Sequence, residues 1–72
     1  MQTLEAIRHM CDTSGQKIAA VSKAIGRSRA FLSNMLTRGN NPRIDTLIEI
    51  AGACGYKVEL VRDGERIELE AE

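Results

Sequence analysis

Apolar residues recur every three or four positions in four stretches of the chain, and this spacing predicts four short helices. In the third stretch, Ser28 is the expected N-cap of the helix, and Gly39 suits the left-handed residue that ends it. Gly26 and Gly55 are expected to end the second and fourth helices. The expected helices cover residues 3–12, 16–25, 28–38 and 44–54.

After residue 55 the hydrophobic period changes from that of a helix to that of a strand. The sequence YKVELVRDGERIELE alternates around Asp63 and Gly64, and this dipeptide is a strong hairpin signal. The expected hairpin covers about residues 56–70, and its register sets Glu59 against Glu68, a like-charge pair with a small cost. The same register places four apolar side chains on one face: Val58, Leu60, Ile67 and Leu69.

With 72 residues, the chain is expected to form a single domain over residues 1–72, mainly α, with four helices and a C-terminal two-stranded hairpin. A domain of this size buries little core, and small domains often gain stability from disulfides, a metal or a partner subunit. Cys11 and Cys54 are too few for a disulfide scaffold, and the spacing of Cys and His does not match a zinc site. We therefore expect a partner subunit, with no metal and no cofactor.

Secreted proteins, membrane-spanning proteins and enzymes are all disfavoured by what the sequence lacks. The N-terminus has Glu5 where a secretion signal needs a cationic and then apolar run, and no apolar run reaches membrane-spanning length. We therefore expect a cytoplasmic protein with no membrane partner. His9 is the only histidine, and nothing suggests a nucleophile beside a base, so we expect no catalytic residues and no enzyme activity.

The formal net charge is zero, but the charges are separated along the chain. Residues 16–43 contain six Lys and Arg and no Asp or Glu, whereas residues 44–72 contain eight acids and three bases. A cationic middle beside an acidic tail favours an anionic partner for the middle segment.

The third expected helix has an unusual exposed side. At about 100° per residue, its apolar side chains share one sector, and the opposite sector carries small, polar residues and no acid. Such a surface suits a helix in the DNA major groove, because short side chains allow close approach and amide or hydroxyl groups reach base edges. The wheel alone also fits a solvated helix that happens to be small and polar.

The segment from residue 16 to residue 56 resembles the helix-turn-helix domain of the Cro/repressor family of bacterial and phage regulators. The resemblance rests on Val21, Ser22 and Gly26 in and after the second helix, on the sequence FLS from Phe31, and on the later sequences GNNP and DTLIEIAGACGY. It implies a lambda-repressor-like fold in which the hairpin replaces a fifth helix. The chain departs from the family pattern at Lys17, Arg27 and Arg43, and each departure adds positive charge.

The resemblance implies roles for individual residues. The base-reading positions of the family's recognition helix match Arg29, Ala30, Ser33 and Asn34. We add Thr37, which lies on the same exposed side of the expected helix. The candidates for phosphate contacts are Gln16, Lys17, Arg27, Ser28, Arg38, Asn40, Asn41 and Arg43. Phosphate contacts are expected to supply most of the affinity and the base-reading face the specificity.

The leading functional hypothesis is a sequence-specific transcriptional regulator of double-stranded DNA, of the repressor type found in phages and mobile elements. One alternative is an antitoxin of the same fold whose acidic tail binds a toxin partner, and another is a helical protein-interaction module. Regulators of the resembled type bind as pairs, so we expect a homodimer, with Val58, Leu60, Ile67 and Leu69 as dimerisation residues. The same four residues could instead pack on the chain's own helices.

Overall fold

A computed structural model describes residues 1–72 and contains four helices followed by one antiparallel hairpin. The predicted mainly α fold with a terminal hairpin is confirmed, although the ends of the helices differ from the expected ones by up to three residues. None of the helices is long and apolar enough to cross a membrane. The elements are α1 (Thr3–Ser14), α2 (Ile18–Ala24), α3 (Phe31–Arg38), α4 (Ile44–Ala53), β1 (Val58–Arg62) and β2 (Glu65–Leu69).

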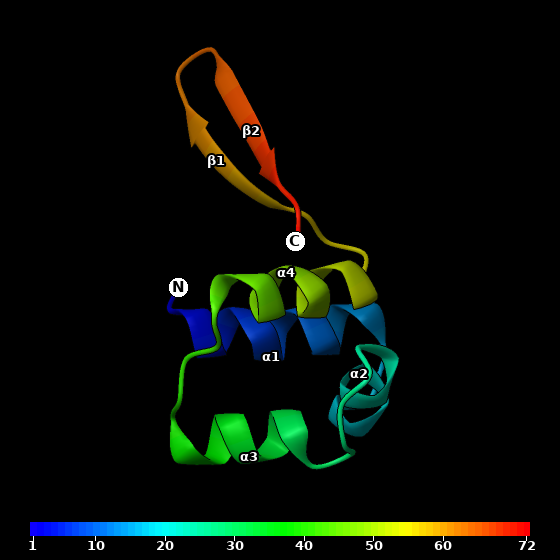
Figure 1. Cartoon of the computed structure of the whole chain (residues 1–72). Helices are drawn as coiled ribbons and strands as arrows, with labels where there is room; N and C mark the ends of the chain where they lie inside the picture. Colours follow the sequence, from blue (N-terminus) through cyan, green and yellow to red (C-terminus); the bar gives the residue numbers. More distant parts are fainter.

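The elements are arranged so that α3 and the hairpin lie at opposite ends of the molecule. In Figure 1, α1 and α4 lie side by side in the middle, α3 runs below them, and the hairpin projects above them. The view looks nearly along α2 but across α3, so the two helices cross steeply, as in a helix-turn-helix unit. Because α2 packs on both α3 and α4, it connects the outlying α3 to the rest of the body.

The hydrophobic core draws on all four helices. Ile7, Val21, Leu32 and Ile50, one from each helix, are completely buried. Each of them lies at a position that the helical spacing marks as apolar. The remaining buried apolar residues are Met10, Cys11, Met35, Leu36, Ala51 and Cys54.

The first helix is longer than the expected residues 3–12, because Thr13 and Ser14 also belong to it. Thr13 Oγ donates a hydrogen bond to the His9 carbonyl at 3.0 Å, and Ser14 Oγ donates one to the Cys11 carbonyl at 2.9 Å. These hydroxyls bond back to the preceding turn and are compatible with helical backbone. The helix ends instead at Gly15, whose φ of 72° is left-handed.

The prediction that Ser28 caps the third helix was wrong. Helix α3 begins at Phe31, and Ala30 precedes it without a side-chain cap. The Ser28 carbonyl accepts a hydrogen bond from the Phe31 N–H at 3.1 Å, so the residues between them form a separate turn. The start of α3 is instead bonded by a side chain of α2. Ser22 Oγ accepts a hydrogen bond from the Leu32 N–H at 3.1 Å.

Ser22 joins α2 and α3 at a point that water does not reach. Its hydroxyl donates to the Ile18 carbonyl at 3.1 Å while it accepts from Leu32, and the residue is fully buried. The first N–H groups of a helix have no partner within the helix, and a buried unpaired N–H is costly. This single hydroxyl therefore fixes where α3 begins relative to α2.

The hairpin has the predicted register. Leu60 pairs with Ile67 and Val58 pairs with Leu69 across the ribbon. The Glu59–Glu68 opposition is also present. Two ion pairs offset it, from Lys57 Nζ to Glu68 at 3.5 Å and from Arg66 to Glu59 at 3.6 Å.

Most of the apolar face of the hairpin does not pack on the chain's own helices. Only Val58, at the base of the ribbon, packs against the core. Further out, Leu60 is 56% exposed and Ile67 is 46% exposed, and Figure 1 shows the ribbon projecting from the helical body. Of the two alternatives that the sequence left open, packing on the body therefore applies to the base of the ribbon alone.

We expect Ser22→Ala to lower the free energy of unfolding by about 1–3 kcal/mol, because the Leu32 N–H would be left buried without a partner. Urea denaturation of the two proteins measures this difference. A matched control is Ser33→Ala, which removes an exposed hydroxyl bonded to the Ala30 carbonyl and should change the same quantity by less than about 0.5 kcal/mol. Equal effects of the two substitutions would contradict the role given to Ser22.

Candidate nucleic-acid interface

The five candidate base-reading residues all lie on the surface of the molecule. Ser33, Asn34 and Thr37 belong to α3 and are exposed, while Leu32, Met35 and Leu36 of the same helix are buried. Arg29 and Ala30 are exposed in the turn that precedes α3. All five are therefore accessible to a partner, three on α3 and two in the turn before it.

The cations around α3 have no acidic partners. The three ion pairs of the structure use Lys57, Arg62 and Arg66, and all three pairs lie in the hairpin region. The six cations of residues 16–43 are all exposed, and none of them forms an ion pair. Unpaired cations beside a polar helix face give this end of the molecule an uncompensated positive charge.

Two candidate phosphate contacts occupy equivalent places in their helices. Lys17 is the N-cap of α2 and Arg43 is the N-cap of α4, and neither side chain caps its own helix. Both residues are exposed. Their side chains are therefore free to reach an anion near the start of each helix.

Gln16 has a structural contact that the sequence did not suggest. Its Nε2 donates a hydrogen bond to the Ala53 carbonyl at 2.8 Å, and the residue is half-buried. The bond joins the segment before α2 to the last turn of α4. Gln16 therefore helps to hold the start of α2 in place, a role that differs from the phosphate contact expected for it.

One flank of α3 is hollowed. A depression of about 310 Å³ runs along this flank into the turn and loop at the two ends of the helix. Phe31 and Met35 supply apolar surface, and the remaining lining residues supply a guanidinium, two amides and a hydroxyl. Three expected phosphate contacts, Ser28, Arg38 and Asn40, are thereby gathered with Asn34, an expected base-reading residue.

Arg27 lies beside this hollow in a contact that its sequence position did not predict. Its guanidinium carbon is 4.6 Å from the centroid of the Phe31 ring, a cation–π distance. Where the resembled family usually has a hydrophobic residue, this chain therefore covers part of the Phe31 ring with a cation. Arg27 remains exposed, so the same side chain can also face an anionic partner.

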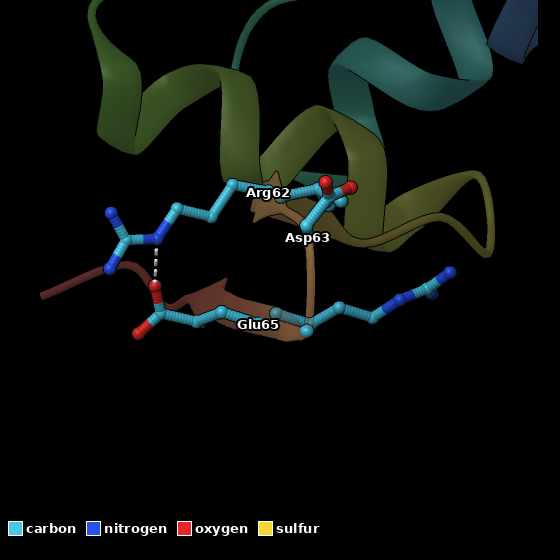
Figure 2. Close-up of a pocket in the computed structure, with 6 residues that line it drawn as sticks. Arg62, Asp63 and Glu65 are labelled. Atoms are coloured by element: carbon cyan, nitrogen blue, oxygen red, sulfur yellow. Dashed lines mark hydrogen bonds and ion pairs between the residues drawn. The ribbon is translucent and has the colours of Figure 1, made fainter.

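A larger depression, of about 700 Å³, lies at the tip of the hairpin, but it does not have the character of a binding site. Residues 61–66 of the hairpin form all of it, and no second element contributes. Figure 2 shows Arg62 and Glu65 reaching toward each other beside the turn, with Arg62 Nε 2.8 Å from a Glu65 oxygen. Their charges already neutralise each other, and no group of three or more His, Cys, Asp or Glu side chains is placed to hold a metal ion.

The two cysteines lie in the core and do not form a disulfide. Cys11 is 2% exposed and Cys54 is 7% exposed. Burial, with smaller contributions from Cys54 and Asp12, raises the pKa of Cys11 to about 11. A buried thiol with a raised pKa is a poor nucleophile, so the cysteines contribute packing here.

Comparisons of this chain with models of protein families, with curated proteins and with solved structures gave no match.

The raised pKa of Cys11 predicts slow alkylation. In the folded protein at pH 8, Cys11 should hold about a hundredfold less thiolate than an ordinary thiol with a pKa of 9.0. Iodoacetamide labelling followed by mass spectrometry should therefore modify Cys11 slowly in buffer and rapidly in urea. Rapid modification of the folded protein would contradict the burial described.

The same pKa sets the direction of a pH effect on stability. Because the folded state holds the Cys11 proton more tightly than the unfolded state does, ionisation of this thiol destabilises the fold. The Cys11 contribution to the free energy of unfolding should fall as the pH rises from about 9 to about 11. The difference in stability between the protein and Cys11→Ala, measured across this range, isolates that contribution.

Proposed function

We propose that the protein binds double-stranded DNA sequence-specifically through the exposed face of α3 and acts as a transcriptional regulator. The observation that carries this proposal is the combination of a small, polar, exposed helix face with six exposed cations of residues 16–43 that form no ion pair. Unpaired Lys and Arg side chains can bind the phosphates of DNA. Short amide and hydroxyl side chains can form hydrogen bonds with the edges of bases.

The base-reading half of the proposal rests on the exposed residues at the start and on the face of α3. Asn34 can form a bidentate contact with adenine, and Arg29 can form one with guanine. Ser33 and Thr37 offer hydroxyls, and Ala30 leaves room for a base or a thymine methyl group. Because Ser22 fixes the start of α3 from α2, these groups are presented on a rigid scaffold.

The backbone-binding half rests on residues around that face. Lys17 lies at the start of α2, Arg38 in the last turn of α3 and Arg43 at the start of α4, so the segment that contains the base-reading residues has cations before, within and after it. The hollow on the flank of α3 suits a sugar–phosphate unit. Phe31 and Met35 would contact the deoxyribose, while Arg38 and the hydroxyl or amide groups at the rim would contact the phosphate oxygens.

The resemblance to the Cro/repressor family makes the proposal more specific. On that basis we propose a repressor of the phage or mobile-element type that acts on DNA in the cytoplasm. The acidic hairpin lies at the end of the molecule opposite α3, so its carboxylates would not face the phosphates of a bound duplex (Figure 1).

Affinity for duplex DNA should fall steeply as the salt concentration rises. The reason is that several Lys and Arg side chains displace counterions from the DNA phosphates when the protein binds. Lys17→Ala or Arg43→Ala should weaken binding to all sequences alike and lower the log–log salt slope by about 1. Fluorescence anisotropy at several salt concentrations measures both effects. Lys57→Ala, which removes a hairpin cation paired with Glu68, is the control and should leave the slope unchanged.

Specificity should depend on residues that differ from those that set affinity. Arg29→Ala or Asn34→Ala should cost roughly 1–3 kcal/mol on the preferred site and relax the preference at one base pair. Selection of bound sites from a random duplex pool, repeated with each variant, measures the preference. Arg38→Ala is the matched control, since loss of a phosphate contact weakens binding without changing the selected sequence. Identical selected sequences for all three variants and the parent would refute the assignment of the base-reading face.

A further inference from the structure

The contact between Arg27 and Phe31 is a feature of this chain rather than of the pattern that it resembles. Where that pattern usually has a hydrophobic residue, Arg27 places its guanidinium carbon 4.6 Å from the centroid of the Phe31 ring. Phe31 is half-buried, packs against the hydrophobic core and also lines the hollow on the flank of α3. The ring is therefore a fixed surface against which a long and flexible cationic side chain packs.

Hydrogen bonds hold the backbone at both ends of this contact. The Arg27 N–H donates to the Ser22 carbonyl at 3.0 Å, and the Phe31 N–H donates to the Ser28 carbonyl at 3.1 Å. The first bond follows the end of α2, and the second closes the turn that precedes α3. The fold therefore sets the backbone of both residues, and only the side-chain torsions of Arg27 are left for the ring to order.

The charge of Arg27 is not used within the protein. The side chain takes part in none of the three ion pairs, and the one guanidinium that donates a hydrogen bond belongs to Arg62. A guanidinium that packs on an aromatic face keeps its N–H groups in a plane, from which they can still donate to an anion. A lysine carries a compact charge with rotatable donors and lacks this planar fork.

We propose that Phe31 is a positioning residue for Arg27: its ring holds the guanidinium at the edge of the hollow, where the guanidinium binds a phosphate of the DNA backbone. This inference rests on the proposed DNA-binding function and adds a requirement for arginine and for an aromatic partner at these two positions. Because the side chain is ordered before DNA arrives, less rotamer freedom is lost on binding, and the phosphate contact is stronger.

A purely structural role for the contact makes different predictions. If Arg27 only shields the ring from water, substitutions at the two positions would change the stability of the fold, and their effects on DNA affinity would be independent. If the ring acts through Arg27, the effect of Phe31 on DNA affinity requires an arginine at position 27. A double-mutant cycle separates the two roles.

The first measurement needs no DNA. The ring current of Phe31 should move the Arg27 δ-proton resonances of the free protein upfield of those of the other arginines. Phe31→Leu should abolish this displacement, whereas Phe31→Tyr keeps an aromatic face and should retain it. Circular dichroism checks that each variant is folded. Arg27 δ protons that resonate with those of the other arginines in the parent would overturn the proposal.

The second measurement is affinity for a duplex, read by fluorescence anisotropy. Arg27→Ala should weaken binding about tenfold, because it removes a charge-assisted hydrogen bond to phosphate. Phe31→Leu should weaken it about threefold through loss of the cation–π contact, while Phe31→Tyr should bind as the parent does. In the Arg27→Ala background, Phe31→Leu should have no further effect, since leucine still supplies an apolar surface to the hollow.

Replacement of arginine by lysine completes the test. Arg27→Lys should weaken binding about threefold, and Arg43→Lys, at an exposed cation without a ring contact, should stay within about twofold of the parent. Additive effects of Arg27→Ala and Phe31→Leu, or parental affinity in Arg27→Lys, would overturn the positioning role. Either result, with a parent that binds DNA, would leave the proposed function standing, whereas a parent that does not bind DNA would overturn both.

Discussion

The hydroxyl of Ser22 is the contact on which the geometry of the proposed DNA-binding surface depends. It lies at the crossing of α2 and α3, fully buried, and bonds the Ile18 carbonyl and the Leu32 N–H at the same time. An alanine there would leave the Leu32 N–H unpaired, and a larger residue would have to displace neighbours in a close-packed core. Ser22 thereby positions the first turn of α3 relative to α2. The burial of Leu32, Met35 and Leu36 then leaves Ser33, Asn34 and Thr37 of that helix exposed.

The second organising feature is the separation of charge between the two ends of the molecule. A chain with no net charge carries its unpaired cations around α2 and α3, and it pairs hairpin carboxylates with hairpin cations. The ion pairs of the hairpin are exposed and contribute little to stability. Their consequence is electrostatic: the hairpin neutralises part of its own charge and leaves the α3 end positive.

The sequence predicted the elements that depend on local periodicity. Helical spacing identified the core residues of every helix, and the Asp63–Gly64 turn with its alternating flanks predicted the register of the hairpin. The start of α3 could not be predicted from local signals, because its buried N–H is satisfied by Ser22, ten residues earlier. For the same reason the sequence did not reveal that Gln16 bonds Ala53, which lies 37 residues later. The contact of Arg27 with Phe31 is local, but it depends on the conformation of the turn between α2 and α3. The exposed residues of α3 followed from the helical wheel, but the hollow that gathers Ser28, Arg38 and Asn40 beside them required the packed structure.

The central claim is that the α3 end of this molecule contacts duplex DNA while the hairpin tip does not. Titration of the isotope-labelled protein with a short duplex, followed by the backbone amide resonances, tests it directly. We expect the largest shift changes at residues 29–37, smaller ones near Lys17 and residues 38–43, and none at the hairpin tip around Asp63. Changes confined to the hairpin, or no change at any residue at low salt, would contradict it.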